Sequence, residues 1–251
     1  MNVLSLFAGI GGLELGLERA GMTVVGQVEL DPWARQVLAK HWPDVARHDD
    51  VRSAPEWWTS EERPDVDLVC GGFPCQDISL AGRGVGIGGE RSGLWKAMLD
   101  TIRAVRPRYV LIENVSALAF RGLDVVLADL ASGGFDAEWT VFRAADFGAP
   151  HGRERLYIVA YRPGVDGSAW DRMGEGGVRP TSIAARGLPG LAAPAVRRRA
   201  AEWLEREPSV GRLAYGVPRQ VDRLRGLGNS VVPQVAEHLG RLILEDAAVA
   251  A

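Results

Sequence analysis

A cysteine stands in a segment where chemistry is expected. Residues 66–70 form an apolar run, and the chain continues as Gly71-Gly72-Phe73-Pro74-Cys75-Gln76. Ligands of open α/β sheets bind beyond the carboxyl ends of the strands, so Cys75 is expected to lie where a ligand binds. Its reactivity would require a partly exposed, electropositive setting that favours the thiolate. Cys70 lies inside the apolar run and is expected to be a buried small residue.

Acidic and basic groups follow in two later segments. Residues 109–112 are apolar and lead directly into Glu113, so this carboxyl group is a candidate proton donor or hydrogen-bond anchor. His151, Arg153 and Arg155 precede another strand-like run, residues 156–161. Taken singly, the arginines could equally form surface ion pairs, and His151 could be an ordinary loop histidine. The two cysteines have no accompanying cluster of ligands, so no metal site is expected.

Glycines follow the first apolar run, residues 3–7. A dinucleotide fingerprint starting at Gly9 and Gly11 would need a third glycine where the chain has Glu14. A negative side chain there would oppose a pyrophosphate at the helix N-terminus, which favours a nucleoside ligand without phosphates. Glu29 ends the second strand, where an acidic residue can bind ribose hydroxyls. A tight turn that packs helix on strand is the open alternative.

Strand-like and helix-like segments alternate through most of the chain. Strands are predicted at residues 3–7, 23–28, 66–70, 109–112, 138–143 and 156–161, and helices at 13–20, 31–41, 92–105, 124–130, 194–207 and 233–245. This alternation predicts an α/β fold, a doubly wound Rossmann-like sheet, mostly parallel, with helices on both faces. Residues 163–192 are rich in Gly, Pro and Arg without periodicity and are predicted to form loops.

Composition limits the class of protein. The 251 residues are 47% hydrophobic and 24% charged, and no apolar run approaches the ~20 residues of a membrane span. The N-terminus lacks the pattern of a signal peptide, so a cytoplasmic protein with reduced cysteines is expected. The net charge of −3 divides into 14 basic against 21 acidic residues in 1–150, and 15 against 11 in 151–251. The basic excess of the second part hints at an anionic partner there.

Five short motifs occur in a specific order. They are Phe7-Ala8-Gly9-x-Gly11-Gly12, Pro74-Cys75-Gln76, Glu113-Asn114-Val115, Arg153-x-Arg155 and Gly228-Asn229-Ser230-Val231-Val232. Their order and spacing resemble the DNA cytosine-C5 methyltransferase family over nearly the whole chain except 163–215. The resemblance implies methyl transfer from S-adenosylmethionine to cytosine C5 in a specific double-stranded DNA sequence, on a base flipped out of the helix.

The resemblance also assigns roles to residues. Cys75 would add to cytosine C6, Glu113 would hold the N3/N4 edge of the base, Arg153 would lie on its O2 side and Arg155 would orient the same pocket. Cofactor contacts would come from Phe7 against adenine, Glu29 on the ribose and Asp50 on the adenine amino group. Further cofactor-binding residues would be Gly9, Gly11, Leu30, Pro74, Leu94 and Asn229.

DNA contacts are expected in two places. Gln76, Ser79 and Arg83 follow the cysteine, and Arg197, Arg198 and Arg212 lie in a short target-recognition region, residues 163–217. Residues 1–162 and 218–251 would form the catalytic and cofactor-binding domain. The protein is expected to act as a monomer, with any cognate restriction endonuclease a separate protein.

Three departures from the family's pattern and three rivals complete the expectation. Leu30 stands where the family often has tryptophan, His151 stands where it usually has glutamine, and the recognition segment is short for the family. The rivals are the same chemistry on RNA (tRNA), a non-catalytic DNA-binding regulator and a nicotinamide oxidoreductase. A pure DNA binder would not need Cys75, Glu113, Arg153 and the cofactor loop together, and Glu14 argues against a dinucleotide.

Overall fold

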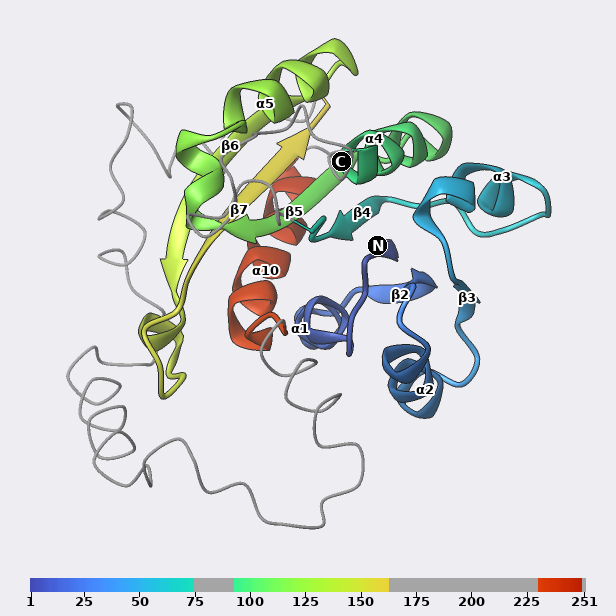
Figure 1. Ribbon diagram of the computed structural model, residues 1–251, viewed down its shortest axis with the longest axis horizontal. Coiled ribbons are helices and arrows are strands. Elements are labelled where there is room, and N and C mark those ends of the chain that lie inside the picture. Colours follow the sequence, from blue (N-terminus) through green and yellow to red (C-terminus); the bar gives the residue numbers. More distant parts are fainter. Residues whose placement is uncertain (75–92, 163–229, 250–251) are drawn as a thin grey trace.

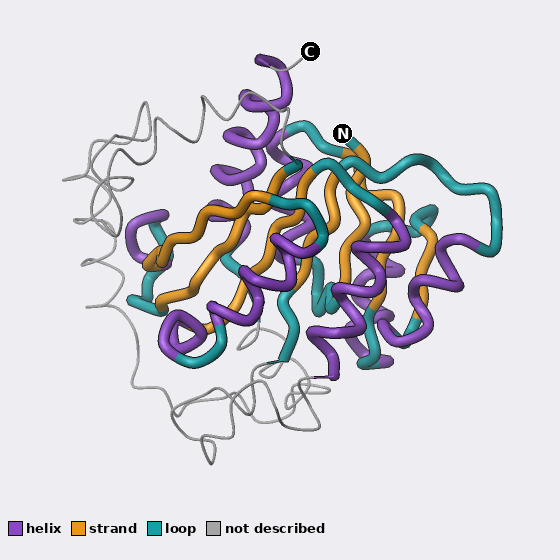
Figure 2. Tube along the Cα trace, turned by 90° about the horizontal axis from the view of Figure 1, so that it is seen from above, coloured by secondary structure: helices purple, strands orange, loops and turns teal. Residues whose placement is uncertain are grey.

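The computed structural model describes residues 1–74, 93–162 and 230–249 (Figure 1). These residues form one seven-stranded sheet in the order β3-β2-β1-β4-β5-β7-β6, and Figure 2 shows the strands lying side by side. The strands are β1 (Asn2–Leu6), β2 (Thr23–Val28), β3 (Ala46–His48), β4 (Leu68–Gly71), β5 (Tyr109–Val115), β6 (Asp136–Arg143) and β7 (Glu154–Tyr161). Pairing is parallel from β3 to β5, whereas β7 is antiparallel to both β5 and β6.

Helices connect these strands and cover both faces. The α-helices are α1 (Gly12–Ala20), α2 (Pro32–His41), α3 (Ala54–Thr59), α4 (Gly93–Val105), α5 (Leu123–Ser132) and α10 (Pro233–Val249). Short 3₁₀ turns are η1 (Val51–Ser53), η4 (Ser116–Phe120) and η5 (Ala144–Phe147). Asp31 caps the N-terminus of α2, because its carboxylate accepts hydrogen bonds from Trp33 N and Ala34 N. Pro32 occupies the first turn, where its missing N–H is no loss.

Two apolar layers lie on opposite faces of the sheet. One joins the strands to α3, α4 and α5 through residues such as Trp58, Met98 and Leu130. The other joins them to α1 and α10 through residues such as Leu17, Leu239 and Ile243. Figure 1 shows α4 and α5 on one side of the sheet and α1 and α10 on the other. The chain therefore has the predicted α/β architecture, with a mostly parallel sheet covered on both faces.

The α1–α10 contact brings the two ends of the described chain together. A Cβ atom on Gly16 would lie 2.3 Å from the carbonyl oxygen of Pro233 and 2.5 Å from Ala236 Cβ. A Cβ atom on Gly240 would lie 2.8 Å from Ala20 Cβ. These glycines allow the helices to touch at backbone distance, which places residues 230–232 beside the first loop.

Some elements differ from the predictions. The short strand β3 and helix α3 were not predicted, because three residues or a single turn carry too little periodicity to be recognised. The predicted recognition region, residues 163–217, lies outside the described residues, as does the start of the segment 218–251. No helix in the described ranges is both long and apolar enough to cross a membrane.

Candidate active site

A cavity of about 720 Å³ opens at the carboxyl ends of β1, β2, β4 and β5. It is lined by nine of the residues singled out from the sequence: Phe7, Gly9, Glu29, Leu30, Asp50, Pro74, Leu94, Glu113 and Arg155. Because the carboxyl ends of parallel strands meet at one edge of the sheet, segments far apart in the chain converge here. The expected cofactor residues and the expected base-pocket residues thus line one continuous space.

The loop after β1 has a fixed, compact conformation. Phe7 and Gly9 both have positive φ, 55° and 56°, which is uncommon for a residue such as phenylalanine. The backbone N–H of Gly9 donates to Glu29 Oε2 at 2.7 Å, and the N–H of Asp31 donates to Oε1 at 2.7 Å. Glu29 therefore ties the first loop to the second and presents a fixed carboxylate to the cavity.

Asp50 also lines the cavity. Its carboxylate accepts from the Arg52 backbone at 3.0 Å and from the Arg52 guanidinium, whose closest contact is 2.7 Å. The hydrogen bonds from Arg52 lower the pKa of Asp50 below its ordinary value. Leu30 lines the same end of the cavity and is 66% exposed, so it offers an apolar surface to a ligand.

Glu113 lies near the carboxyl end of β5 in a buried position. Its Oε1 lies 2.9 Å from Nε of Arg155 on β7. A Cβ atom on Gly72 would lie 2.7 Å from Glu113 Oε2, so only glycine lets the loop after β4 approach so closely. Burial raises the pKa of the Glu113 carboxyl group, and the positive charges of Arg155 and Arg153 oppose that rise. Burial thus favours the neutral form of this carboxyl group more than water would, and the two arginines favour the charged form.

Asn114 is a site residue to which sequence reasoning gave no role. It is buried, its Nδ2 donates to the carbonyl oxygen of Phe73 at 3.2 Å, and its Oδ1 accepts from Val115 N at 2.8 Å. The side chain thus fixes the loop that leads to Pro74 and Cys75. An amide next to a strand-end acid was the available signal, since amides commonly tie down loop backbone.

Arg153 contacts the C-terminal segment rather than the cavity. Its guanidinium donates to the carbonyl oxygen of Ser230. Ser230 and Val231 themselves line the cavity, and a Cβ atom on Gly12 would lie 2.7 Å from the Val231 carbonyl oxygen. Residues 230 and 231, which precede α10, therefore pack against the first loop.

Several predicted residues are not at the cavity or not described. Gly11 does not line it, because this residue faces Trp42, whose ring would lie 2.4 Å from an added Cβ atom. Outside the described residues are Cys75, Gln76, Ser79, Arg83, Arg197, Arg198, Arg212 and Asn229. Their assignments stay predictions. In the described ranges no group of three His, Cys, Asp or Glu side chains could hold a metal ion.

Two buried groups clarify the sequence reasoning. Cys70 is fully buried, and burial raises the pKa of its thiol well above the ordinary range, which makes it inert as a nucleophile. Glu14 is also fully buried and does not line the cavity. The inference that its charge would repel a bound phosphate was therefore wrong, because the helical position turns the side chain into the interior.

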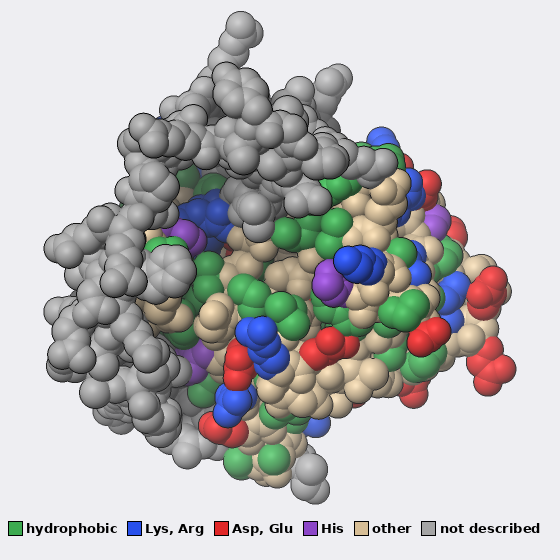
Figure 3. All heavy atoms as spheres, turned by 90° about the horizontal axis from the view of Figure 1, so that it is seen from below, with side chains coloured by type: hydrophobic (Ala, Val, Ile, Leu, Met, Phe, Trp, Pro, Cys, Tyr) green, Lys and Arg blue, Asp and Glu red, His purple; other side chains and the backbone are tan. Residues whose placement is uncertain are grey.

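Charge on the outer surface is mixed. Figure 3 shows acidic and basic side chains interspersed on one face of the described residues. Two exposed ion pairs join residues four apart on one helix, Arg241 with Glu237 at 2.7 Å on α10 and Lys96 with Asp100 at 3.4 Å on α4. Such exposed pairs contribute little to stability.

Comparison with known proteins agrees with this geometry. Residues 1–174 match the family model described as C-5 cytosine-specific DNA methylase. The chain is 41% identical over 171 residues to the type II methyltransferase M2.BsuMI of Bacillus subtilis, covering 64% of this chain and 42% of that protein. It is 32% identical over 200 residues to the type II methyltransferase M.NgoFVII of Neisseria gonorrhoeae, covering 76% and 53%.

A structural comparison supports the fold. The crystal structure of the S. pombe Dnmt2 methyltransferase superposes with a TM-score of 0.63 at 17% identity, covering 98% of this chain and 99% of that one. The chain spans about half the length of the curated relatives that it matches. The motifs, the sheet and the family match together show that the chain belongs to the C-5 cytosine-specific DNA methylase family.

Proposed function

We propose that this protein methylates C5 of cytosine in a specific double-stranded DNA sequence, with S-adenosylmethionine as methyl donor. The observation that carries the proposal is the single cavity that joins Phe7, Glu29 and Asp50 at one end to Glu113 and Arg155 at the other. A methyl donor and a target base must meet at one point, and a continuous cavity permits this.

The residues present fit the methyl donor. A cavity of about 720 Å³ is within the ordinary range for ligand pockets and combines apolar walls with a few fixed polar groups. Phe7 and Leu30 would pack against the adenine, the Glu29 carboxylate would bind the ribose hydroxyls, and Asp50 would accept from the adenine amino group. When bound, the cofactor supplies an electrophilic methyl group on a sulfonium.

The chain's own residues would activate the base. Cytosine C5 is a poor nucleophile, and addition of the Cys75 thiolate to C6 makes it an enamine-like carbon that can take the methyl group. Glu113 would hold the N3/N4 edge and supply the proton that the ring takes up at N3, for which a raised pKa is suited. Loss of the C5 proton and β-elimination of the cysteine sulfur would then restore the aromatic ring and the thiolate.

The same proposal assigns a catalytic part and a target-recognition part of the chain. Residues 1–162 and 218–251 would form the catalytic domain and 163–217 the target-recognition region, with Arg197, Arg198 and Arg212 on DNA phosphates. The target base would have to leave the helix to enter the cavity. A restriction endonuclease that cuts the same sequence would be a separate protein in the bacterial or phage-infected cell.

Labelled methyl transfer tests the proposal. The protein is incubated with labelled S-adenosylmethionine and a mixture of DNA and RNA, and the product is mapped at single-cytosine resolution. We expect label at C5 of cytosine in one DNA sequence, loss of transfer in Cys75→Ser, and retention in Cys70→Ala, the matched control on the buried cysteine. Label in RNA alone, on adenine, or undiminished in Cys75→Ser would refute it.

A further inference from the structure

One wall of the cavity is a short segment between β3 and α3. Asp49, Asp50, Val51 and Arg52 are consecutive in the chain, and all four line the cavity. The Val51 side chain is buried in the main apolar core, which anchors the middle of this wall. The position of Asp50 relative to the cavity thus depends on what holds the backbone on either side of Val51.

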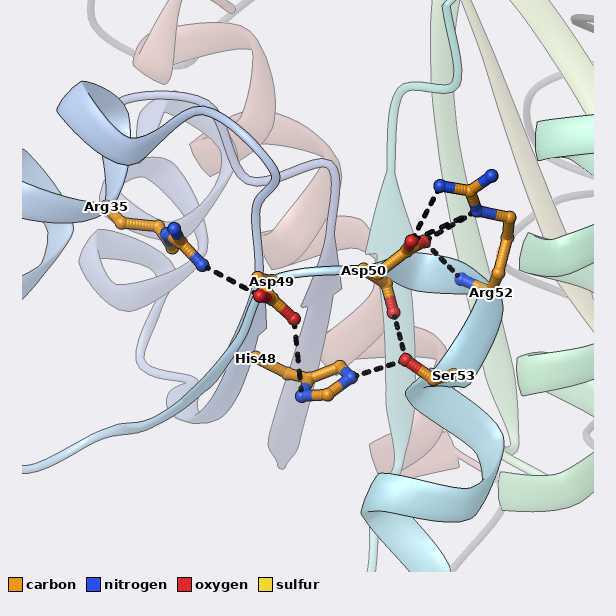
Figure 4. Close-up of polar contacts among 6 residues, drawn as sticks. All are labelled: Arg35, His48, Asp49, Asp50, Arg52 and Ser53. Atoms are coloured by element: carbon orange, nitrogen blue, oxygen red, sulfur yellow. Dashed lines mark hydrogen bonds and ion pairs between the residues drawn. The ribbon is translucent and has the colours of Figure 1, made fainter.

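His48 holds that backbone through a serine. Its Nε2 lies 2.8 Å from Ser53 Oγ, and Ser53 Oγ donates to the carbonyl oxygen of Asp50 at 3.2 Å (Figure 4). The hydroxyl has one proton, which goes to the carbonyl, so it accepts from the imidazole N–H. The same direction excludes Ser53 as a nucleophile activated by His48, because an activated serine donates its proton to the imidazole.

The imidazole has two further neighbours besides Ser53, and the main chain of His48 has one. Its ring stacks on Trp57 of α3, with centroids 5.0 Å apart and planes inclined by 10°. Its Nδ1 lies 4.0 Å from Asp49 Oδ1, and Asp49 Oδ2 lies 3.4 Å from Nη1 of Arg35 on α2 (Figure 4). The main chain of His48 also accepts from Glu29 N at 3.0 Å. His48 therefore connects α2, α3 and the two acidic residues at the cofactor end of the cavity.

We propose that His48 is a positioning residue of the cofactor pocket, which sets the Asp50–Arg52 wall through Ser53. It does not line the cavity itself, so it acts only through its neighbours. The inference rests on the proposed function, since it takes this cavity end as the nucleoside site. Its consequence is that the hydrogen-bond chain His48–Ser53–Asp50 determines affinity for the cofactor but not the rate of methyl transfer once the cofactor is bound.

Binding of S-adenosylhomocysteine to the full-length protein tests this, by calorimetry on His48→Phe and Ser53→Ala. The first keeps an aromatic ring to stack on Trp57 but loses the N–H donor, and the second removes the hydroxyl. We expect the Kd to rise about three- to tenfold in each, and no further in the double variant, because both break one chain. The KM for S-adenosylmethionine should rise alike, with kcat within about twofold of wild type.

Two further variants make the result specific. Ser53→Thr keeps a hydroxyl and should restore binding to near the wild-type value. Ser60→Ala removes a hydroxyl that donates to a carbonyl at the same 3.2 Å distance, but at the other end of α3, and should leave the Kd unchanged. If His48→Phe lowers thermal stability without ligand, the test rests on the Kd values of Ser53→Ala and Ser53→Thr compared with wild type.

The outcomes separate the two proposals. Wild-type protein that does not bind S-adenosylhomocysteine would overturn the proposed function. Wild-type binding combined with an unchanged Kd in Ser53→Ala, additive losses in the double variant, or a fall in kcat with an unchanged KM would overturn the role of His48 alone.

Discussion

Arg155 Nε and Glu113 Oε1 lie 2.9 Å apart on neighbouring antiparallel strands, in a largely buried position. Removal of one partner from a buried pair leaves the other uncompensated, which costs more than removing both. We expect Arg155→Met to lower the free energy of unfolding by about 2–3 kcal/mol at pH 8 and by less at pH 5, where Glu113 can take up a proton. Urea unfolding at both pH values measures this.

Two variants are matched to Arg155→Met: Glu113→Gln alone, and the double variant that combines Glu113→Gln with Arg155→Met. Glu113→Gln leaves the Arg155 charge without its partner, so it should also lower stability, and it should lower kcat by about a hundredfold or more, the usual scale for loss of an acid–base group. The double variant should be more stable than Arg155→Met at pH 8. A double variant that is less stable than Arg155→Met would contradict the buried-charge explanation.

Because Glu14 is buried in the core, we expect it to make the free energy of unfolding depend on pH. Burial raises the pKa of its carboxyl group to about 7, well above the ordinary 4.5, so the folded state binds more protons than the unfolded state between these values. Stability is therefore full below about pH 4.5 and falls as the pH rises through 7. Glu14→Gln should stabilise the protein by about 2–3 kcal/mol at pH 8 and little at pH 5. Glu18→Gln, on the exposed side of α1, is the control in the same urea titrations.

His238 predicts the opposite dependence. It packs on α10 against Phe147 and Phe142, with ring centroids 5.6 and 6.1 Å away, and burial lowers its pKa below the ordinary 6.5. The stability that the neutral His238 ring contributes is therefore present above pH 6.5 and is lost as the pH falls below that value. The drop in Tm between pH 7.5 and 5.5 should shrink in His238→Phe and persist in His41→Gln, which changes an exposed histidine. An equal drop in all three proteins would exclude His238 as the cause.

Gly16 allows the close packing of α1 against α10, and a larger residue there should disturb it. An added Cβ atom would meet the Pro233 carbonyl oxygen at 2.3 Å, so Gly16→Ala must push the helices apart. We expect a loss of about 1–3 kcal/mol in the free energy of unfolding. Gly93→Ala is the control, because nothing lies within 4 Å of a Cβ atom there. Because residues 230–231 line the cavity, Gly16→Ala should also weaken cofactor binding, and calorimetry provides that second measurement.

The recognition region predicts a salt dependence. If Arg197 and Arg198 contact phosphates, the slope of log Kd for a duplex against log salt should fall by about one for each alanine substitution. Filter binding at several salt concentrations measures the slope, with Arg241→Ala on α10 as a control, since Arg241 pairs with Glu237. An unchanged slope in both substituted arginines would place the phosphate contacts elsewhere in the chain.

The order and spacing of short motifs were enough to predict the family, and the alternation of strand-like and helix-like segments predicted the α/β class. Apolar periodicity likewise predicted the long elements. The tertiary structure decided which side chains face the cavity. Gly11 looked equivalent to Gly9 in the sequence but packs on Trp42, and Glu14, expected to face a pyrophosphate, is buried away from the cavity.

The contacts that fix the site join residues far apart in the chain, and local sequence holds no record of them. Asn114 contacts Phe73, and Arg153 contacts Ser230. The contacts of Ser53 with His48 and Asp50 are local, but they lie in a turn that periodicity did not predict. The residue types of the site could be predicted from local sequence, because each of these residues follows or ends a strand-like run. Their mutual distances depend on sheet order and helix packing, which only the folded chain brings about.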